Sequence, residues 1–439
     1  MSAIVGALAC QKNSFLRSFK TSVVASKEYV PVEASQNRNK KKSDIKDLTQ
    51  SKMYAVELKD TILFPEGGGQ PFDKGSIVLP DDKIIEVKSV LRDRLTALHI
   101  TEELLEPGTE VTLNVDWDRR VDLMQQHTGQ HLLSAVFDTY NLETLSWAMG
   151  DSINYIELPE KVSDEVLEQV SSRVNELIFE AHPISVVTPD QHGGELDTSH
   201  IPDDYDVSKG IIRIVKIGNL DANPCCGTHL TSTSQIQAIS LFHQQSIRGG
   251  HSKLFFTCGA RVHKYAAKLH SILKNVSGTH LSCQIDEVVE KVGALSVSYR
   301  KSTSRESNLL REIAAIEARK VYTTWGTREV EYVYRGDNNP EYLTLVQKEL
   351  TTLINSAESP LINFDTKTVV LLNGDYPSGA GGMVKILGPK SSEIQAELKQ
   401  RIQELKGGGK GNSFQGKIVR YGKGELEAVT YYLDSLGEQ

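Results

Sequence analysis

Two short motifs, far apart in the chain, constrain its fold more than any other feature. Residues 127–131 read His-Thr-Gly-Gln-His, and residues 225–229 read Cys-Cys-Gly-Thr-His. On a helix, residues i and i+4 share one face about 6 Å apart, so the first two histidines can converge on one ion. A thiolate and an imidazole from the second motif complete the nitrogen and sulfur ligand set that zinc prefers. The sequence therefore predicts one zinc ion per chain, bound by His127, His131, Cys225 and His229.

The residue after His127 argues against one class of zinc enzyme. A His-Glu-x-x-His protease uses its glutamate as the general base, and this chain has Thr128 at that position. A helical pair of histidines also commonly fills a core or lies on a surface. Two spaced pairs of mixed cysteine and histidine, in a chain with few of either, favour a metal site over that interpretation.

Length and composition are those of an ordinary globular protein. A chain of 439 residues can form two or three domains with hydrophobic cores. The net charge of -8 creates no overall basic field, so any contact with RNA must come from local groups. Five cysteines without a disulfide pattern indicate a reducing compartment, and no apolar run is long enough to span a membrane. We expect a cytosolic protein, with mitochondrial import as the weaker alternative because the N-terminus is poor in acids.

The first 118 residues predict a small antiparallel β-barrel. Short β-rich runs, including residues 53–58, 61–64 and 84–90, alternate with turn residues, and a basic insertion at residues 38–42 reads as a solvated loop. Residues 65–71, Pro-Glu-Gly-Gly-Gly-Gln-Pro, are the most unusual stretch. Their glycines allow close approach of the backbone to a ligand, but the tip of a hairpin would use the same residues.

The segment from residue 119 to 264 predicts an α+β domain that holds the metal. A helix at residues 119–140 carries both histidines of the first motif beside its apolar stripe. Gly129 lies between them at a cost of about 1 kcal/mol relative to alanine, so something must pack or bind close to the backbone there. Strands, a helix at residues 163–181 and a polar loop at residues 189–208 complete the domain.

The remaining chain predicts a helical arm at residues 265–325 and a small α/β domain at residues 326–439. The arm repeats apolar residues every three or four positions among charges, a pattern typical of a spacer or a dimer contact. The last domain contains the run Gly-Gly-Gly-Lys-Gly at residues 407–411, which reads as a flexible, basic segment able to bind a phosphate. It lacks the spacing of a P-loop, so nucleotide hydrolysis is not expected.

These motifs, taken in order, resemble the AlaX family of freestanding alanyl-tRNA editing proteins. The resemblance covers almost the whole chain and rests on the glycine loop at residues 67–70 and the two metal motifs. Weaker support comes from Cys10-Gln11, from residues 60–71, from residues 115–120 and from Gly416-Lys417. The larger eukaryotic members of the family are the most similar. The tail is similar to the C-terminal part of alanyl-tRNA synthetase.

The resemblance implies hydrolysis of the ester in mischarged tRNA(Ala), chiefly seryl-tRNA(Ala) and also the glycyl form. Only about 118 residues precede the metal helix, too few for an aminoacylation domain, so the protein should act in trans. The resemblance implies the same four zinc ligands, although Cys226 stands at a position where the family has glycine and competes with Cys225. It also implies that Gln70, with Gly67, Gly68 and Gly69, lines the aminoacyl or adenosine site, and that Arg119 and Arg120 contact phosphate.

The mechanism and two rival functions remain open at this point. Four protein ligands describe a closed structural zinc site, whereas catalytic zinc keeps one position free. Thr128 and Gln130 flank the ligands and, with Gln70, are the candidate catalytic or serine-sensing residues. One rival is a zinc-stabilised RNA-binding protein without hydrolase activity, and the other is an enzyme that edits a different aminoacyl-tRNA. A homodimer formed through the helical arm or the C-terminal domain is also expected.

Overall fold

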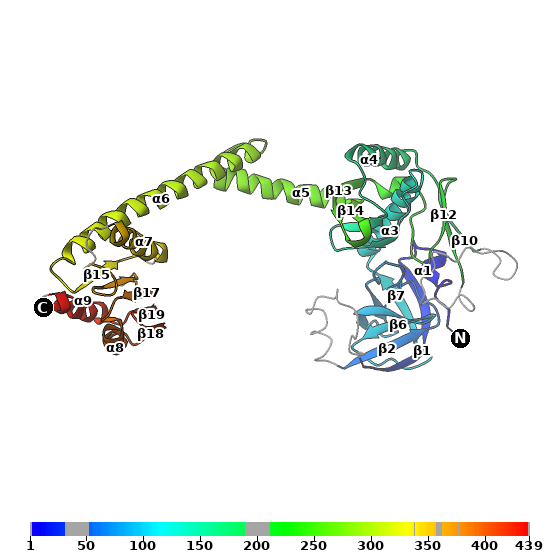
Figure 1. Cartoon of the computed structure of the whole chain (residues 1–439). Coiled ribbons are helices and arrows are strands. Elements are labelled where there is room, and N and C mark those ends of the chain that lie inside the picture. Colours follow the sequence, from blue (N-terminus) through cyan, green and yellow to red (C-terminus); the bar gives the residue numbers. More distant parts are fainter. Residues whose placement is uncertain are drawn as a thin grey trace. The chain divides into compact units, whose positions relative to one another are not determined.

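The computed structural model describes residues 2–30, 52–188, 211–337, 339–356, 362–375 and 378–437 (Figure 1). The expected basic insertion at residues 38–42 and the expected loop at residues 189–208 lie outside this range. The chain forms two compact units, residues 1–274 and residues 275–439. Both mix helices and strands, as expected for an α+β protein. A search of the described helices for one long and apolar enough to cross a bilayer found none.

A seven-stranded antiparallel sheet forms the first part of the N-terminal unit, in the order β4-β3-β7-β1-β2-β6-β5. Its strands are β1 (Ser18–Tyr29), β2 (Met53–Leu58), β3 (Gly75–Val78), β4 (Ile84–Val87), β5 (Ser89–Asp93), β6 (Thr96–Thr101) and β7 (Glu110–Val115). The long strand β1 pairs with β7 through its first residues and with β2 through its last, so it joins the two halves of the sheet. The short helix α1 (Ala9–Lys12) contributes Ala9 and Cys10 to the core of this part.

The prediction of a closed barrel was wrong for the described residues, because the sheet stays open between β4 and β5. Closure would require hydrogen bonds between these two edge strands. Only Lys88 separates them along the chain, which is too short for a hairpin turn, and its N–H donates to Ile100 O at 2.9 Å. The two strands therefore turn away from each other and pair with β3 and β6 respectively.

The prediction of a strand at residues 61–64 was also wrong, because this segment is buried but irregular. Side-chain oxygen atoms accept hydrogen bonds from backbone N–H groups that would otherwise donate to a neighbouring strand. Thr61 N donates to Asp60 Oδ1, and Phe64 N donates to Asp73 Oδ2, each at 2.7 Å. Local side-chain acceptors compete with a sheet ladder in this way. The segment that precedes the glycine loop is consequently held by Asp60 and Asp73 rather than by a sheet.

The second part of the N-terminal unit packs helices on two smaller antiparallel sheets, of order β13-β14-β9-β8 and β10-β11-β12. Its elements are α3 (Trp117–Asp138), β8 (Ser146–Ala148), β9 (Asn154–Leu158), α4 (Asp164–Phe179), β10 (Ile184–Val187), β11 (Ile214–Ile217), β12 (Asp221–Pro224), β13 (Ile239–Ser246), β14 (Ser252–Cys258) and α5 (Ala260–Asn275). The predicted helices appear within two residues of their expected ends, but β8 and β12 were not predicted. A second hydrophobic core joins α3, α4 and the four-stranded sheet β13-β14-β9-β8, called the larger sheet below.

Helix α3 positions the first metal motif and is buried almost throughout. The Asp116 side chain caps it by accepting from Arg119 N at 3.1 Å. Its residues from Leu123 to Phe137 are all buried, so both polar and apolar side chains of this stretch face protein. Figure 1 shows α3 between the larger sheet and the seven-stranded sheet. A helix in this position can present ligands to a site that both parts of the unit help to build.

The C-terminal unit contains a five-stranded sheet of order β15-β16-β17-β19-β18, parallel between β15 and β16 and otherwise antiparallel. Its elements are α6 (Val288–Thr324), β15 (Val330–Arg335), α7 (Pro340–Ser356), β16 (Thr368–Asn373), β17 (Ala380–Leu387), α8 (Ser391–Arg401), β18 (Leu405–Lys410), β19 (Ser413–Arg420) and α9 (Glu425–Gly437). Strand β16 is buried on both faces: Val369 and Leu371 pack with α6 and α7, and Val370 and Leu372 pack with α8 and α9.

The glycine run at residues 407–411 is part of a strand and turn, so the expectation of a flexible segment was wrong. Strand β18 pairs antiparallel with β19 through this run. A Cβ atom at Gly407 would lie 2.4 Å from Gln415 O, and one at Gly409 would lie 1.9 Å from Ser413 O. Gly407 and Gly409 therefore allow close contact between two backbones.

Candidate metal centre and adjoining cavity

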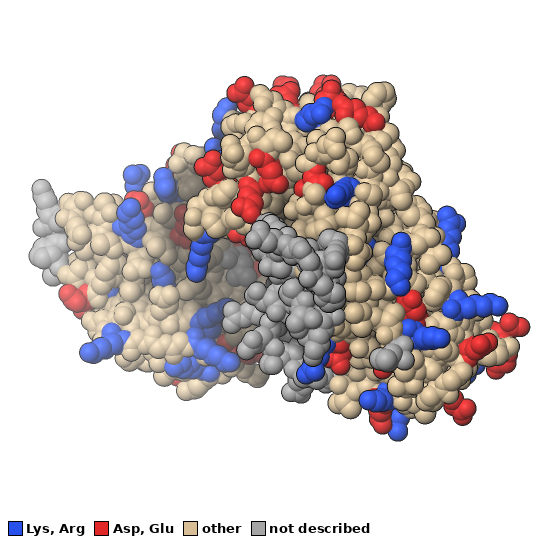
Figure 2. Space-filling view, turned by 90° about the vertical axis from the view of Figure 1, so that its right-hand side faces the viewer, with Lys and Arg blue, Asp and Glu red and all other residues tan. Residues whose placement is uncertain are grey.

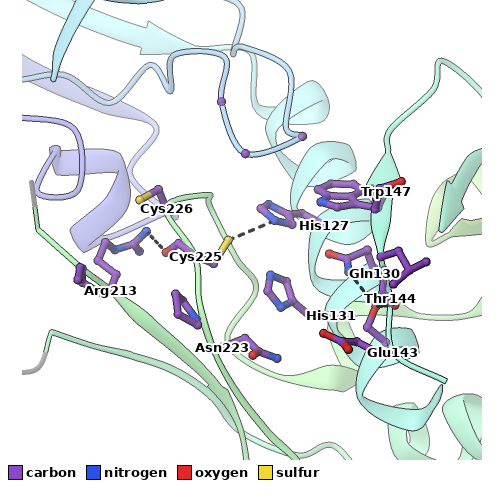
Figure 3. A pocket seen from close by; sticks show the side chains of 18 of the residues that line it. His127, Gln130, His131, Glu143, Thr144, Trp147, Arg213, Asn223, Cys225 and Cys226 are labelled. Carbon is purple, nitrogen blue, oxygen red and sulfur yellow. Dashed lines mark hydrogen bonds between the residues drawn. The ribbon is translucent and has the colours of Figure 1, made fainter. Parts of the chain in front are cut away.

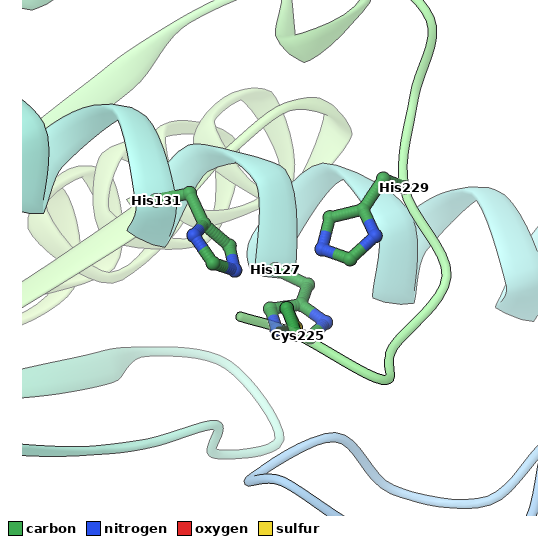
Figure 4. Close-up of side chains that lie close together, drawn as sticks. All are labelled: His127, His131, Cys225 and His229. Atoms are coloured by element: carbon green, nitrogen blue, oxygen red, sulfur yellow. Dashed lines mark hydrogen bonds between the residues drawn. The ribbon is translucent and has the colours of Figure 1, made fainter. Parts of the chain in front are cut away.

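The four predicted ligands lie together on one side of α3 (Figure 4). His127 and His131 come from consecutive turns of that helix, and Cys225 and His229 follow β12. Their candidate ligand atoms all lie within 4.8 Å of one another, and Cys225 Sγ is 3.3 Å from His127 Nε2. Tetrahedral zinc requires separations of about 3.3 to 3.7 Å between such atoms. The cluster therefore fits a metal ion after a contraction of about 1 Å.

Buried nitrogen atoms without partners are a second indication of a ligand site. His131 Nε2 and both ring nitrogens of His229 have no hydrogen-bond partner in the part of the chain that the structure describes. Both residues are nearly inaccessible to water, with exposures of 8% and 3%. A buried polar group left unpaired costs about 1 to 3 kcal/mol. A metal ion held by the cluster would use lone pairs that the protein leaves unused.

Cys225 and His229 favour the protonation states that metal ions bind, whereas His131 favours its protonated form as long as no metal is bound. Burial alone would raise the pKa of the Cys225 thiol, but His127, His229 and His131 together hold that pKa well below its usual value. Burial lowers the pKa of His229 to about 3, so its imidazole is neutral. Burial also works to lower the pKa of His131, but the Cys225 thiolate and Asp221 outweigh it and raise that pKa. Thiolate and neutral imidazole are the forms that donate lone pairs to zinc.

Cys225 and Cys226 have different surroundings. Cys225 belongs to the cluster, whereas the Cys226 side chain packs against the core of the seven-stranded sheet. Their backbone is held through its carbonyl oxygens, because Gln11 Nε2 donates to Cys226 O at 2.6 Å and Arg213 donates to Gly227 O at 3.0 Å. This geometry agrees with the choice of Cys225 over Cys226 as the predicted ligand.

A cavity of ≈ 990 Å³ adjoins the cluster (Figure 3). His127, His131 and Cys225 line it, whereas His229 does not. The predicted substrate-binding glycines Gly67, Gly68 and Gly69 also line it. Two of the lining residues, Arg92 and Arg213, are cationic. Elsewhere, Figure 2 shows Lys and Arg interspersed with Asp and Glu on one face. Because the net charge of the chain is -8, contacts with RNA are expected from local positive groups, and these two arginines are such groups.

The two candidates that flank the ligands occupy different positions. Gln130 lines the cavity, and its Nε2 donates to Ser134 Oγ at 2.9 Å, which in turn lies 2.7 Å from Thr144 Oγ1. Thr128 is fully buried, and its Oγ1 accepts from Leu230 N at 3.1 Å. Gln130 is therefore placed to meet a ligand, whereas Thr128 holds the segment that follows His229.

Gln70, the third candidate, is fully buried and is not part of the cavity lining. Its Oε1 lies 2.8 Å from His127 Nδ1 and accepts from Thr228 N at 3.0 Å. Its Nε2 donates to Thr228 Oγ1 at 2.9 Å. The glycines that precede it line the cavity, whereas the Gln70 side chain lies outside the cavity lining and contacts both metal motifs, through His127 and Thr228.

The two arginines predicted to contact phosphate both have protein partners. Arg120 is fully buried and forms a bidentate ion pair with Asp73, and its NH1 donates to Ser14 O at 2.9 Å. Arg119 is partly buried and donates to Phe72 O through Nε at 3.2 Å and NH2 at 3.0 Å. The buried position of Arg120 gives it no surface on which to meet a phosphate, so we assign it a structural role.

Gly129, between the two helical histidines, lies in close contact with a neighbouring element, as its unfavourable helix propensity led us to expect. A Cβ atom at Gly129 would lie 2.3 Å from Cys258 Sγ at the end of β14. The larger sheet therefore approaches the α3 backbone between the two ligands, and the expectation of close packing there is confirmed. Cys258 is fully buried and belongs to the hydrophobic core around α3.

Trp147 and Arg213 are two of the cavity-lining residues that reasoning from the sequence missed. Trp147 lines the cavity and stacks on His127, with ring centroids 5.1 Å apart and planes at 27°. Nothing in the sequence around this tryptophan marks it. Arg213 is 3% exposed and holds the Cys225 segment. A signal for it did exist, because it is a lone charge within the apolar run Ile-Ile-Arg-Ile-Val at residues 211–215.

Comparison with known proteins connects this geometry to a family. Residues 212–252, which include the second motif, match the family model described as the threonyl and alanyl tRNA synthetase second additional domain. The chain is 38% identical to the putative alanyl-tRNA editing protein alaX of Saccharomyces cerevisiae, over 98% of this chain and 96% of that protein. It is 33% identical to the alanyl-tRNA editing protein Aarsd1 of Mus musculus, over 99% of both chains. The alanyl-tRNA editing protein AlaX-L of Pyrococcus horikoshii is 27% identical, over 83% of this chain and 87% of its own length.

Proposed function

This chain belongs to the family of alanyl-tRNA editing proteins, and on that premise we propose that it deacylates mischarged tRNA(Ala) in trans. The substrate is chiefly seryl-tRNA(Ala), with glycyl-tRNA(Ala) as a second one. One zinc ion per chain is held by His127, His131, Cys225 and His229. The observation that carries the proposal is the position of this cluster, because three of its residues line the same cavity as the glycine loop.

The reaction requires little beyond positioning, because an aminoacyl ester is already activated. Water adds to the ester carbonyl carbon, the bond from that carbon to the ribose oxygen breaks, and the ribose oxygen takes up a proton. Bound zinc would supply a Lewis acid that polarises the carbonyl or the water. The chain itself encloses the aminoacyl group in the cavity, beside the backbone of Gly67, Gly68 and Gly69, and holds the ring of His127 against Trp147.

Serine is selected, in this proposal, by the polar wall around Gln130. Its amide nitrogen donates one of its two N–H groups to Ser134, so the amide oxygen and the second N–H are the groups it can offer to a ligand. That oxygen would accept a hydrogen bond from the serine hydroxyl. Alanine would leave the same acceptor without a donor, and a site built for a hydroxyl discriminates strongly against a substrate that lacks it. Thr128 is left with a positioning role because it is fully buried.

The test compares release of serine and alanine from tRNA(Ala). Wild type should release serine rapidly and spare alanine, and Cys225→Ala should lose both zinc and activity while circular dichroism shows a folded protein. Metal content is measured on the same samples. A folded, zinc-loaded wild type that releases no serine would overturn the proposal and favour the rival function of an RNA-binding protein with structural zinc.

A second aminoacyl-tRNA is the other rival, and the matched family model gives a reason to test it. That model covers both threonyl and alanyl tRNA synthetases. Mischarged tRNA(Ala) and mischarged tRNA(Thr) should therefore compete for the enzyme in one reaction. We expect tRNA(Ala) to be deacylated preferentially. Faster release from tRNA(Thr) would reassign the substrate.

A homodimer through helix α6 is a further part of the proposal. Leu310, Ala314, Ala318 and Val321 of this helix are buried within the C-terminal unit. The neighbouring larger side chains remain exposed, at 48% for Leu309, 43% for Ile313 and 65% for Ile316. A second copy of this helix would cover them. Light scattering should show a dimer that Ile313→Asp with Ile316→Asp converts to a monomer; an unchanged wild-type monomer contradicts this part.

A further inference from the structure

A tight turn delivers Gln70 from the glycine loop to the metal centre. Gly67 and Gln70 exchange two backbone hydrogen bonds of 3.1 Å. The two residues between them, Gly68 and Gly69, have φ angles of +60° and +80°. Positive φ at both central positions is the pattern of a type I′ turn, which side chains other than glycine rarely tolerate. The three glycines thus line the cavity while the glutamine beside them turns away into the protein.

The contacts of the Gln70 amide identify its oxygen. Thr228 N can only donate, and it lies 3.0 Å from Gln70 Oε1, so that atom must be the acceptor. The Nε2 atom then donates to Thr228 Oγ1 at 2.9 Å. One amide is therefore fixed at both ends by a single residue of the second metal motif, the residue immediately before His229.

The fixed amide determines the tautomer of His127. Its Nδ1 atom lies 2.8 Å from Gln70 Oε1, which cannot donate, so Nδ1 must carry the proton. In the neutral imidazole the lone pair is then on Nε2, the atom that lies 3.3 Å from Cys225 Sγ. A hydrogen bond at one ring nitrogen commonly orients a histidine ligand and selects the nitrogen that binds metal.

The surrounding space leaves this arrangement little freedom. A Cβ atom at Gly227 would lie 2.1 Å from His127 Cε1 and 2.7 Å from Gln70 Oε1, so only glycine fits beside the pair. On another side, Trp147 stacks on the His127 ring. A Cβ atom at Gly69 would lie 2.7 Å from the indole of Trp147. The glycine loop therefore contacts the surroundings of His127 twice, through Gln70 and through Trp147.

We propose that Gln70 is a positioning residue for the metal centre, which holds His127 as the Nε2 ligand and couples the order of the glycine loop to metal binding. This rests on the proposed zinc site. Because Gln70 is fully buried behind the cavity wall, it acts through His127 and does not touch the substrate. Coupling is reciprocal, so an ordered loop strengthens metal binding and bound metal orders the loop.

The first test measures metal affinity in the full-length protein by zinc competition with a chromophoric chelator. Gln70→Met keeps the size of the side chain but removes all three hydrogen bonds of the amide, and it should weaken zinc affinity by about 10- to 100-fold. Gln70→Glu retains an acceptor for His127 Nδ1 and for Thr228 N, and it should stay within a few-fold of wild type. The cobalt(II) absorption spectrum should change in Gln70→Met and remain close to that of wild type in Gln70→Glu.

Gln126→Met is the matched control. Gln126 is also fully buried, and its amide contacts Cys258 N and Asn154 Nδ2, each at 2.9 Å, rather than a ligand. It should lower stability to chemical unfolding without changing zinc affinity or the cobalt spectrum. Equal loss of zinc affinity in Gln126→Met and Gln70→Met would overturn the proposal, because general destabilisation would then explain both. Wild-type affinity in Gln70→Met would overturn it as well.

The second test follows the loop by hydrogen exchange in residues 65–72. Zinc should increase protection of this segment in wild type and in Gln126→Met, but much less in Gln70→Met. Equal zinc-dependent protection in all three proteins would contradict the coupling. Both tests are read without tRNA, so they stand apart from the assay of serine release. A wild type that releases serine normally but binds no zinc would overturn the metal site and this proposal, and leave the hydrolase intact.

Discussion

Two buried polar clusters in the N-terminal unit differ in whether their atoms have partners. Asp73 and Arg120 are both fully buried, and the guanidinium also donates to the carbonyl oxygens of Ser14 and Ile62. The carboxylate in turn accepts from Phe64 N. The three histidines of the metal cluster are also buried, yet His131 and His229 keep ring nitrogens without partners among the described residues.

The difference separates a structural cluster from a ligand site. A buried charge is tolerated when hydrogen bonds and an opposite charge compensate it within the protein. The Asp73–Arg120 pair meets that condition, and it fixes the segment before the glycine loop to the start of α3. The histidine cluster does not meet it without a ligand. Burial alone therefore does not distinguish the two clusters. The ring nitrogens without partners mark the histidine cluster as the ligand site.

The largest effect is expected from breaking the satisfied cluster. Asp73→Ala leaves the Arg120 charge buried without its partner, which should destabilise the N-terminal unit by about 3 to 5 kcal/mol. Hydrogen exchange of peptides from residues 52–188 in urea measures this loss, with an excess of chelator so that metal binding does not contribute. Cys225→Ala under the same conditions should cost much less. Equal losses in the two variants would remove the distinction between the clusters.

The next effect comes from the unsatisfied cluster when its ligand is removed. Metal that binds only the folded state at 100 to 1000 times its Kd adds about 3 to 4 kcal/mol of stability. Chelation should therefore lower the unfolding midpoint of wild type and leave Cys225→Ala unchanged. Asp73→Asn serves as the second comparison, because it should keep the response to chelator. A response in Cys225→Ala would point to a metal site elsewhere in the chain.

His99, a buried histidine whose ring nitrogens both have hydrogen-bond partners, extends the comparison to the pH dependence of stability. His99 is fully buried, with Nδ1 3.1 Å from Val56 O and Nε2 2.8 Å from Thr61 Oγ1. Burial lowers its pKa to about 4, from 6.5 in the unfolded chain. The unfolded chain therefore binds the proton first, and stability is lost as the pH falls from 6.5 to about 4, by roughly 3 kcal/mol in total. Urea unfolding of wild type and His99→Gln across this range should isolate that loss, and identical pH profiles would contradict it.

The smallest effect concerns the packing between the two helical ligands. Gly129→Ala places a methyl group against Cys258 Sγ, and overpacking that costs about 1 to 3 kcal/mol is partly offset by helix propensity of about 1 kcal/mol. A net loss of about 1 kcal/mol is expected. Cys258→Ala in the same chain should restore part of it, as a double-mutant cycle would show. Additive losses would mean that the contact does not limit this position.

Much of the fold was predictable because it rests on local patterns. The helices expected at residues 119–140 and 163–181 appear within two residues of their expected ends. The barrel was mispredicted because closure depends on pairing between two edges, which no local pattern encodes. The glycine run at residues 407–411 was mispredicted for a related reason: close approach of a neighbouring strand requires glycine just as a flexible loop does.

The site divides in the same way. Residue type and spacing were enough to select the four candidate ligands and the glycine loop, because ligand chemistry depends on the identity of the side chain and on helical periodicity. Only the tertiary structure decided what the neighbouring polar residues do. It buried Gln70 against His127, buried Arg120 against Asp73, and left Gln130 at the cavity. A polar side chain is defined by its partners, and those partners come from segments that are distant in the sequence and close only in the folded chain.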